Sequence, residues 1–175
     1  MVETWTLIDE EPGSAGYLPI VNRRYRLPDG TRAEWDIFGS TQTVAVLAIT
    51  PADSVVLARQ YRPGPGCILD ELPGGAVEPG EDVPAAAARE LLEETGYAGD
   101  VRIVGSTWLA SGSRTRRFIA VAENAVRVAE PANEPGEFCD VVLLSLTEFR
   151  SHLRAGALTD VDLGYLALDH LGFIS

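Results

Sequence analysis

The run Thr43–Thr50, TVAVLAIT, constrains the fold more than any other stretch, because it is apolar almost without interruption. A strand at a sheet surface alternates polar and apolar residues, whereas a short continuous apolar run indicates a strand covered on both faces. The segment Val55–Tyr61 follows after the turn Pro51–Ser54 and is predicted to pair with this strand. The sequence therefore predicts a sheet that is covered on both sides.

The other elements are predicted in the order strands, one helix, strands and two helices. Strands are expected over 17–26 and 32–39, joined by the hairpin turn Leu27–Gly30. We expect the segment 62–68 to be irregular and a loop to begin at Gly74–Gly75. Further strands are expected over 101–110, 116–122 and 138–144, followed by helices from Ser145 to about Ala155 and over 160–171. This order predicts a mixed α/β fold of the α+β type.

Length and charge limit the classes of protein and partner. A chain of 175 residues suits one domain over 41–175, preceded by a small N-terminal β segment over 1–40. The formal net charge of −12 disfavours nucleic acid and anionic membranes as partners. The basic runs 23–26 and 114–117 are the exceptions, and each is interpreted as an exposed strand face.

The start of the chain and its cysteines bear on location. No apolar run approaches the roughly 20 residues that a membrane-spanning helix needs. The N-terminus carries acids where a signal peptide would be basic and then apolar. Cys67 and Cys139 have no spacing typical of a disulfide framework or a thiolate metal site. We therefore expect a cytoplasmic protein.

The segment Val83–Thr95 is predicted to be a helix with well-marked ends. Asp82 can cap the free N–H groups, Pro84 fits the first turn, and Gly96 suits the left-handed position after the last turn. The four alanines at 85–88 add high helix propensity.

Three carboxylates gather on this helix. Glu90 and Glu94 lie one turn apart on the same face, and Glu93 lies beside them. Like charges at this spacing repel, so the cluster is either a solvated acidic face or a site shared with a cation. Hard divalent cations such as Mg2+ prefer oxygen ligands. Arg89, four residues before Glu93, can orient that carboxylate, and Glu81 is expected near the same cluster.

A longer pattern decides between these alternatives. Five residues separate Gly75 from Glu81, seven more precede Arg89-Glu90-Leu91, and Glu93-Glu94, Gly96 and Tyr97 complete the pattern. This pattern resembles the Nudix box at every specified position. The resemblance implies a Nudix hydrolase fold, in which a mixed β-sheet is sandwiched between helices and a small N-terminal β subdomain is added.

Other stretches resemble the ADP-ribose and ADP-sugar pyrophosphatases of that superfamily: LARQYR at 57–62, DELPGG at 70–75, EFCDVV at 137–142 and LRAGALTD at 153–160. The segment from Tyr17 to Trp35 resembles their N-terminal subdomain, which implies a homodimer. The implied reaction is Mg2+-dependent hydrolysis of the pyrophosphate bond of ADP-ribose or a nucleotide sugar. Its products would be a nucleoside monophosphate and a sugar phosphate.

The same resemblance implies the metal ligands and the catalytic residues. The carboxylates of Glu90, Glu93 and Glu94 and the carbonyl of Gly74 would hold Mg2+, with Mn2+ as an alternative. Glu137 or Glu134 would activate water, with Glu93 and Arg89 as the other catalytic residues. The alternative interpretation of Glu134 and Glu137 is an exposed acidic loop.

The resemblance also implies the residues that bind the substrate, a small nucleotide. Arg62 and Glu71 would contact its diphosphate or its nucleotide part. Tyr17 and Trp35 would stack on its base, unless these aromatic residues merely belong to a core or a strand face. Ser111–Ser113 departs from the S-P-G segment of the ADP-ribose group. Another nucleotide, including a triphosphate, therefore stays open as the substrate. A non-catalytic nucleotide-sensing domain is the second alternative, although the box is intact.

Overall fold

The computed structural model describes residues 5–13, 19–39, 41–132 and 138–174. The chain divides into two compact units. The N-terminal unit comprises Met1–Gln42 and Trp108–Arg116, and the main unit comprises Thr43–Thr107 and Arg117–Ser175. Within the described residues, no helix is both long enough and apolar enough to cross a membrane.

The N-terminal unit contains a three-stranded sheet in the order β1-β2-β3. Its strands are β1 (Thr6–Pro12), β2 (Ile20–Arg26) and β3 (Arg32–Phe38), and both neighbouring pairs are antiparallel. Gly30 has a φ of 86°, a conformation that glycine adopts without strain, so the predicted turn between β2 and β3 is confirmed. Strand β1 was not predicted from the sequence.

Ion pairs take up the basic run of β2. Arg23 pairs with Glu10, and Arg24 pairs with Asp9 at 2.6 Å and with Glu11 at 2.8 Å. The partners all lie on β1, which lies antiparallel beside β2. These two arginines therefore pair with all three acidic residues of the first strand.

The main unit is built on a seven-stranded sheet. Its order is β10-β5-β4-β9-β8, with β6 paired to β5 and β7 paired to β4. The strands are β4 (Gln42–Ile49), β5 (Ser54–Arg62), β6 (Cys67–Glu71), β7 (Gly74–Ala76), β8 (Tyr97–Trp108), β9 (Arg116–Arg127) and β10 (Asp140–Ser145). The helices are α1 (Val83–Thr95), α2 (Leu146–Ala155) and α3 (Val161–His170). The α+β class and the mixed sheet are confirmed.

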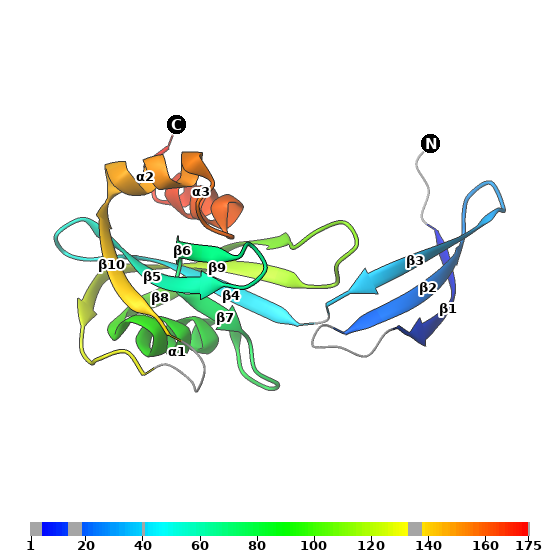
Figure 1. Cartoon of the computed structure of the whole chain (residues 1–175), viewed down its shortest axis with the longest axis horizontal. Coiled ribbons are helices and arrows are strands. Elements are labelled where there is room, and N and C mark those ends of the chain that lie inside the picture. The colour runs from blue at the N-terminus through cyan, green and yellow to red at the C-terminus, as the bar shows by residue number, and fades with distance from the viewer. Residues whose placement is uncertain (1–4, 14–18, 40, 133–137, 175) are drawn as a thin grey trace. The chain divides into compact units, whose positions relative to one another are not determined.

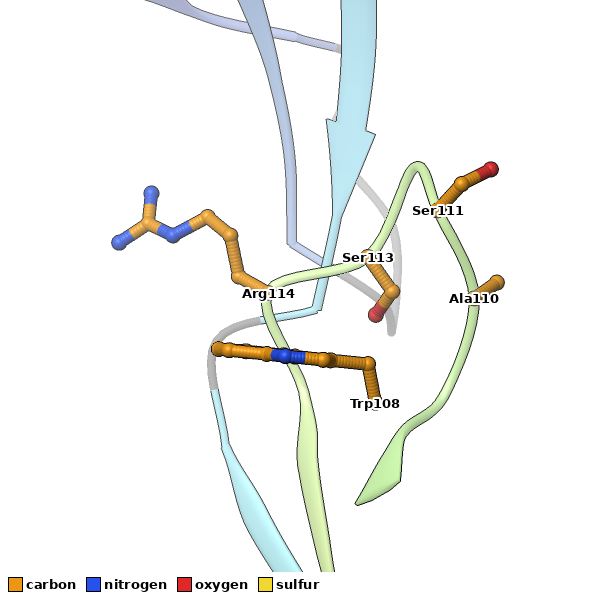
Figure 2. Close-up of a pocket in the computed structure, with 5 residues that line it drawn as sticks. All are labelled: Trp108, Ala110, Ser111, Ser113 and Arg114. Atoms are coloured by element: carbon orange, nitrogen blue, oxygen red, sulfur yellow. The ribbon is translucent and has the colours of Figure 1, made fainter. Parts of the chain in front are cut away.

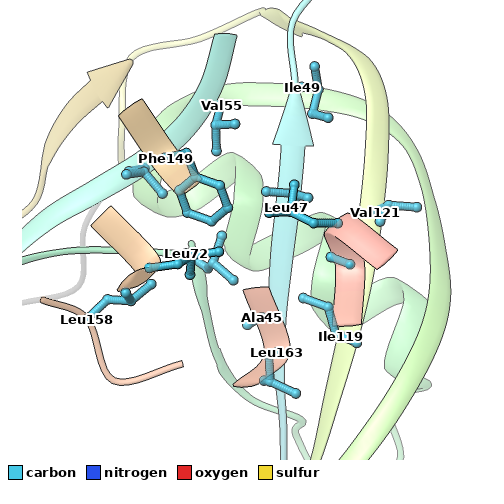
Figure 3. Packing of buried hydrophobic residues seen from close by; sticks show 14 residues of the cluster. Ala45, Leu47, Ile49, Val55, Leu72, Ile119, Val121, Phe149, Leu158 and Leu163 are labelled. Carbon is cyan, nitrogen blue, oxygen red and sulfur yellow. The ribbon is translucent and has the colours of Figure 1, made fainter. Parts of the chain in front are cut away.

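Helices cover both faces of this sheet, with α1 on one face and α2 and α3 on the other (Figure 1). The central strand β4 shows how the sequence specifies two faces. Leu47 and its alternate neighbours Ala45 and Ile49 pack in the cluster that contains Phe149 of α2, as Figure 3 shows. Val44, Val46 and Ala48 pack with Ala86, Ala87 and Leu91 of α1. The apolar run is therefore a strand covered on both faces, as predicted.

The helix ends match the predicted signals. The side chain of Asp82 accepts a hydrogen bond from the backbone N–H of Ala85, and Gly96 is left-handed with a φ of 72°. Ser145 and Glu148 form a complete capping box at the start of α2. Local hydrogen bonds of this kind depend on neighbouring residues only, which is why the sequence revealed them.

Several predicted bounds were wrong. The segment 62–68 is not irregular throughout, because β5 extends to Arg62 and β6 begins at Cys67. Gly74–Gly75 lies in β7, where the absence of side chains lets it pair closely with β4. Strand β8 begins at Tyr97 and β9 continues to Arg127, so both are longer than predicted. Strand β10 is Asp140–Ser145 rather than 138–144 and β2 begins at Ile20, because pairing with neighbours sets strand ends.

Candidate active site

The predicted acidic cluster lies on α1, where packing fixes its orientation. Ala86, Ala87 and Leu91 are fully buried against the sheet. The small alanine side chains allow the helix backbone to approach the strands closely. The side chains of Glu90 and Glu93 are 13% and 40% exposed, and Glu94 is 7% exposed. The cluster therefore lies at the edge of the buried face of the helix.

Arg89 links the cluster to the loop before α1. Its guanidinium pairs with Glu81 at 3.0 Å, Glu90 at 2.8 Å and Glu93 at 3.0 Å, and it donates to the carbonyl of Ala76 at 3.0 Å. Glu81 contributes most to raising the pKa of Arg89. The hydrogen bond from Arg89 in turn lowers the pKa of Glu81 below its usual value. The arginine therefore contacts three carboxylates at once and joins the loop to the helix.

Glu94 is held from two other elements. Its Oε2 accepts a hydrogen bond from the backbone N–H of Gly74 at 2.9 Å, and its Oε1 accepts one from the side chain of Gln60 at 3.4 Å. Gln60 was not predicted as a site residue, because it lies within the LARQYR stretch but outside the box. Its amide contacts a predicted metal ligand from the neighbouring strand β5. Contacts of this kind orient ligands in metal sites.

The predicted metal ligands fit a hard divalent cation by their chemistry. Glu90, Glu93 and Glu94 present carboxylate oxygens, the donors that Mg2+ and Mn2+ take. Gly75 leaves room beside them, since a Cβ there would lie 2.5 Å from Oε1 of Glu90. Within the described ranges, no three His, Cys, Asp or Glu side chains are already gathered around one cation position. Glu90 and Glu93 contact Arg89, whereas Glu94 contacts Gly74 and Gln60. The ligand roles stay a prediction.

The predicted diphosphate contacts Arg62 and Glu71 are paired with each other in an ion pair. Glu71 is fully buried, and its other oxygen accepts hydrogen bonds from the backbone N–H of Thr159 at 3.2 Å and from its hydroxyl at 2.5 Å. Arg62 remains partly exposed, with 37% of its side chain accessible. Of the two, only Arg62 presents surface to a ligand.

Of the predicted aromatic and loop residues, the structure describes Trp35, whose role in base stacking stays a prediction. Trp35 is 46% exposed on β3, and its ring lies 5.9 Å from that of Trp5, which also contacts Tyr25. Tyr17, Glu134 and Glu137 lie outside the described residues. Their predicted roles in base stacking and water activation therefore stay predictions.

The loop that departs from the ADP-ribose pattern borders a cavity of about 630 Å3 in the N-terminal unit. Figure 2 shows Trp108, Ser111, Ser113 and Arg114 around it. Trp108 is 59% exposed, and the guanidinium of Arg116 lies 4.8 Å from the centre of its ring. Arg114 contacts Glu10 at 3.5 Å. The second basic run is thus engaged with an aromatic ring and an acid of its own unit.

Comparisons with known proteins agree with the resemblance to the Nudix box. The model of the NUDIX domain matches residues 39–162. An ADP-ribose pyrophosphatase of Saccharomyces cerevisiae is 28% identical over 144 residues, which are 71% of this chain and 62% of that protein. An ADP-sugar pyrophosphatase of Mus musculus is 51% identical over 110 residues, which are 59% of this chain and 50% of that protein. The matches thus span between half and two thirds of these relatives.

A crystal structure of an ADP compounds hydrolase has the same fold. It superposes with a TM-score of 0.81, covers 99% of both chains and is 22% identical in sequence. At that identity the likeness establishes the fold, including the helices on both faces of the sheet. Together with the match over residues 39–162 and the complete box, it leads to one assignment: the chain belongs to the NUDIX domain family.

Proposed function

We propose that this chain hydrolyses the pyrophosphate bond of a nucleoside diphosphate derivative, ADP-ribose or a nucleotide sugar, with Mg2+ as its cofactor. The observation that carries the proposal is the cluster Glu90, Glu93 and Glu94 beside the side-chain-free backbone of Gly74–Gly75. The names of the yeast and mouse relatives support the substrate class. The products would be a nucleoside monophosphate and a sugar phosphate.

The chain's own residues would prepare the reaction. A divalent cation held by the three carboxylates would neutralise the pyrophosphate and polarise a P–O bond. Arg89 would orient Glu90 and Glu93 through its ion pairs with them. Arg62 would present its partly exposed guanidinium to the diphosphate. Glu134 or Glu137 would take the proton from the attacking water.

The assignment of the carboxylates is tested by removing their charge. Glu90→Gln and Glu94→Gln should each lower turnover by about a hundredfold or more, because a metal ligand loses its charge while its shape is kept. Glu123→Gln is the matched control, since Glu123 is a half-exposed carboxylate paired with Arg102 on another part of the sheet. Chelation should abolish activity, and added Mg2+ should restore it. Unchanged Mg2+-dependent turnover in both variants would refute the assignment.

The substrate is tested by a panel of ADP-ribose, ADP-sugars, other nucleotide sugars and nucleoside triphosphates. ADP-ribose or an ADP-sugar should give the highest kcat/KM. Preference for a nucleoside triphosphate would support the alternative that another nucleotide is the substrate. Tight binding without turnover of any panel member would support the sensing alternative instead.

We also propose a homodimer formed through the N-terminal unit. Trp5, Leu7, Ile8 and Trp35 are each between 40% and 46% exposed on this small sheet, and an apolar surface of this kind favours burial against a partner. Light scattering should give twice the chain mass at micromolar concentration.

We also propose a cytoplasmic location. The free Cys67 and Cys139 support it, and cell fractionation tests it.

A further inference from the structure

We propose that the turn between α2 and α3 positions Arg62 for the diphosphate of the substrate by acting through the buried carboxylate of Glu71. The inference rests on the proposed function, because that proposal assigns Arg62 to the substrate. It changes the expected role of Glu71 from a substrate contact to a positioning residue. It also gives Thr159 a role that the sequence analysis did not foresee.

Glu71 is fully buried and has no accessible surface. A buried carboxylate is unfavourable unless donors satisfy its oxygens. Thr159 supplies two donors to Oε1, its backbone N–H at 3.2 Å and its hydroxyl at 2.5 Å. The Nε–H of Arg62 donates to Oε2. With both oxygens engaged and no exposed surface, Glu71 is placed to hold Arg62 rather than to bind a ligand.

The contact with Glu71 orients Arg62 while leaving its terminal nitrogens available. A guanidinium has five N–H donors, and Glu71 takes the one on Nε. Within the part of the chain that the structure describes, Glu71 is the ion-pair partner of Arg62. The side chain is 37% exposed. The two Nη groups can therefore form the paired hydrogen bonds that phosphate oxygens accept.

Arg62 lies on the same face of β5 as a contact of the acidic cluster. Exposure alternates along the end of this strand, so that Gln60 and Arg62 are both half-buried while Arg59 and Tyr61 are exposed. Side chains two residues apart on a strand point to the same side. Gln60 donates to Glu94 at 3.4 Å. Arg62 is therefore directed to the side of the sheet where the metal-bound diphosphate would lie.

The turn that carries Thr159 is itself anchored to the sheet. Arg117 of β9 is 7% exposed and pairs with Asp160, the residue after Thr159, and with Asp162 at 3.1 Å. Burial raises the pKa of Asp160, and the charge of Arg117 opposes that rise. Leu158, next to Thr159, is 5% exposed and packs in the core cluster. A turn anchored through Leu158 and Asp160, on either side of Thr159, can hold Glu71 in one orientation. Glu71 in turn limits the conformations that the side chain of Arg62 can adopt.

A double-mutant cycle on ligand affinity tests the inference. ADP in the presence of Mg2+ is the probe, because it carries the two phosphates without the second group, and calorimetry measures its binding without turnover. Thr159→Val removes the hydroxyl but keeps the backbone donor and the shape, and Thr159 is an exposed residue, so the core is unaffected. Thr159→Ser keeps the hydroxyl and is the matched control.

Thr159→Val should weaken ADP binding about three- to tenfold, the range for one hydrogen bond. Thr159→Ser should bind ADP within about twofold of the unmodified chain. In the Arg62→Ala background, Thr159→Val should cause no further loss, because its effect passes through Arg62. A purely structural role would lower the melting temperature in both backgrounds without this dependence on Arg62.

Two results would overturn the inference: no change in ADP affinity for Thr159→Val, or an equal loss with and without Arg62. Failure of the proposed function has a different signature. A chain that binds ADP and shows the expected cycle but hydrolyses no member of the substrate panel would refute the proposed reaction and support the positioning role. A chain that does not bind ADP would refute both.

Discussion

Gly75→Ala is the substitution that isolates the geometry of the acidic cluster most cleanly. Gly75 lies in β7, and its φ is not in the left-handed region, so alanine can adopt its backbone conformation. An added Cβ would lie 2.5 Å from Oε1 of Glu90, 2.7 Å from its Cδ and 2.8 Å from its Oε2. The three nearest atoms thus all belong to one predicted metal ligand.

The size of the effect follows from these distances. Ordinary contact with a Cβ begins at 3.4 Å, so the nearest oxygen at 2.5 Å must move by about 0.9 Å, the difference between the two. The atoms that move form the end of a flexible side chain, so the free energy of unfolding should change by less than about 1 kcal/mol. Misplacing a catalytic group by about 1 Å costs on the order of a hundredfold in rate. Gly75→Ala should therefore lose about a hundredfold in kcat/KM at nearly unchanged stability.

The assay combines Mg2+-dependent hydrolysis of the best panel substrate with urea unfolding. Gly64→Ala is the matched control, because a Cβ at Gly64 meets no atom within 4 Å and needs no left-handed backbone. The control should retain its activity. Full activity of Gly75→Ala at all Mg2+ concentrations would show that the carboxylate of Glu90 need not lie where it does. Loss of both folding and activity would show that the added methyl group moves the backbone instead.

Three further outcomes are expected. Trp35→Ala should raise the KM for an adenine nucleotide by about one to two decades with a smaller change in kcat, since base stacking contributes roughly 1–3 kcal/mol; an unchanged KM would mean that the base binds elsewhere. Ser145→Ala should lower the free energy of unfolding by about 1 kcal/mol through loss of the cap, measured by urea titration. Ser145 also lowers the pKa of Glu148, so the stability from this contact is present above pH 4.5 and is lost as pH falls below it. The Ser145→Ala variant should therefore lose less stability than the unmodified chain on acidification, and parallel pH profiles of the two would contradict this.

The sequence predicted the features that depend on local chemistry. The caps of α1 and α2 need only the side chains of Asp82 and Ser145 beside free backbone groups. The apolar run Thr43–Thr50 needs only its own composition to indicate two covered faces. The Nudix box needs only the spacing of its acids along one helix. Each of these signals lies within a short stretch of sequence and does not depend on the helices and strands that pack against it.

The features that were missed depend on residues far apart in the sequence. Gln60 contacts Glu94 across 34 positions, and Glu71 contacts Thr159 across 88. No pattern near Glu71 indicates that it is fully buried, since acidic residues are usually exposed. Strand β6 was missed because the proline and glycine residues of the turn before it outweigh its short apolar stretch. Pairing with β5 supplies the stability that its own sequence does not indicate.

Ser111–Ser113 illustrates how a departure from a family pattern can be understood physically. The proline of the S-P-G segment would fix one backbone angle of the loop. Here the hydroxyl of Ser113 donates to the carbonyl of Phe38 at 3.2 Å and accepts from the backbone N–H of Thr115 at 3.1 Å. The backbone N–H of Phe38 donates to the carbonyl of Gly112 at 3.1 Å, and the backbone N–H of Arg114 donates to the carbonyl of Phe38 at 2.9 Å.

Three of these four hydrogen bonds join the loop to Phe38 at the end of β3 within the N-terminal unit, and the fourth lies between Ser113 and Thr115 of the loop itself. They order it by contacts with another segment rather than by a restricted backbone angle, and a glycine at position 113 would remove two of them. The absence of the proline therefore changes which interactions hold the loop. It does not mean that the loop has lost a fixed conformation.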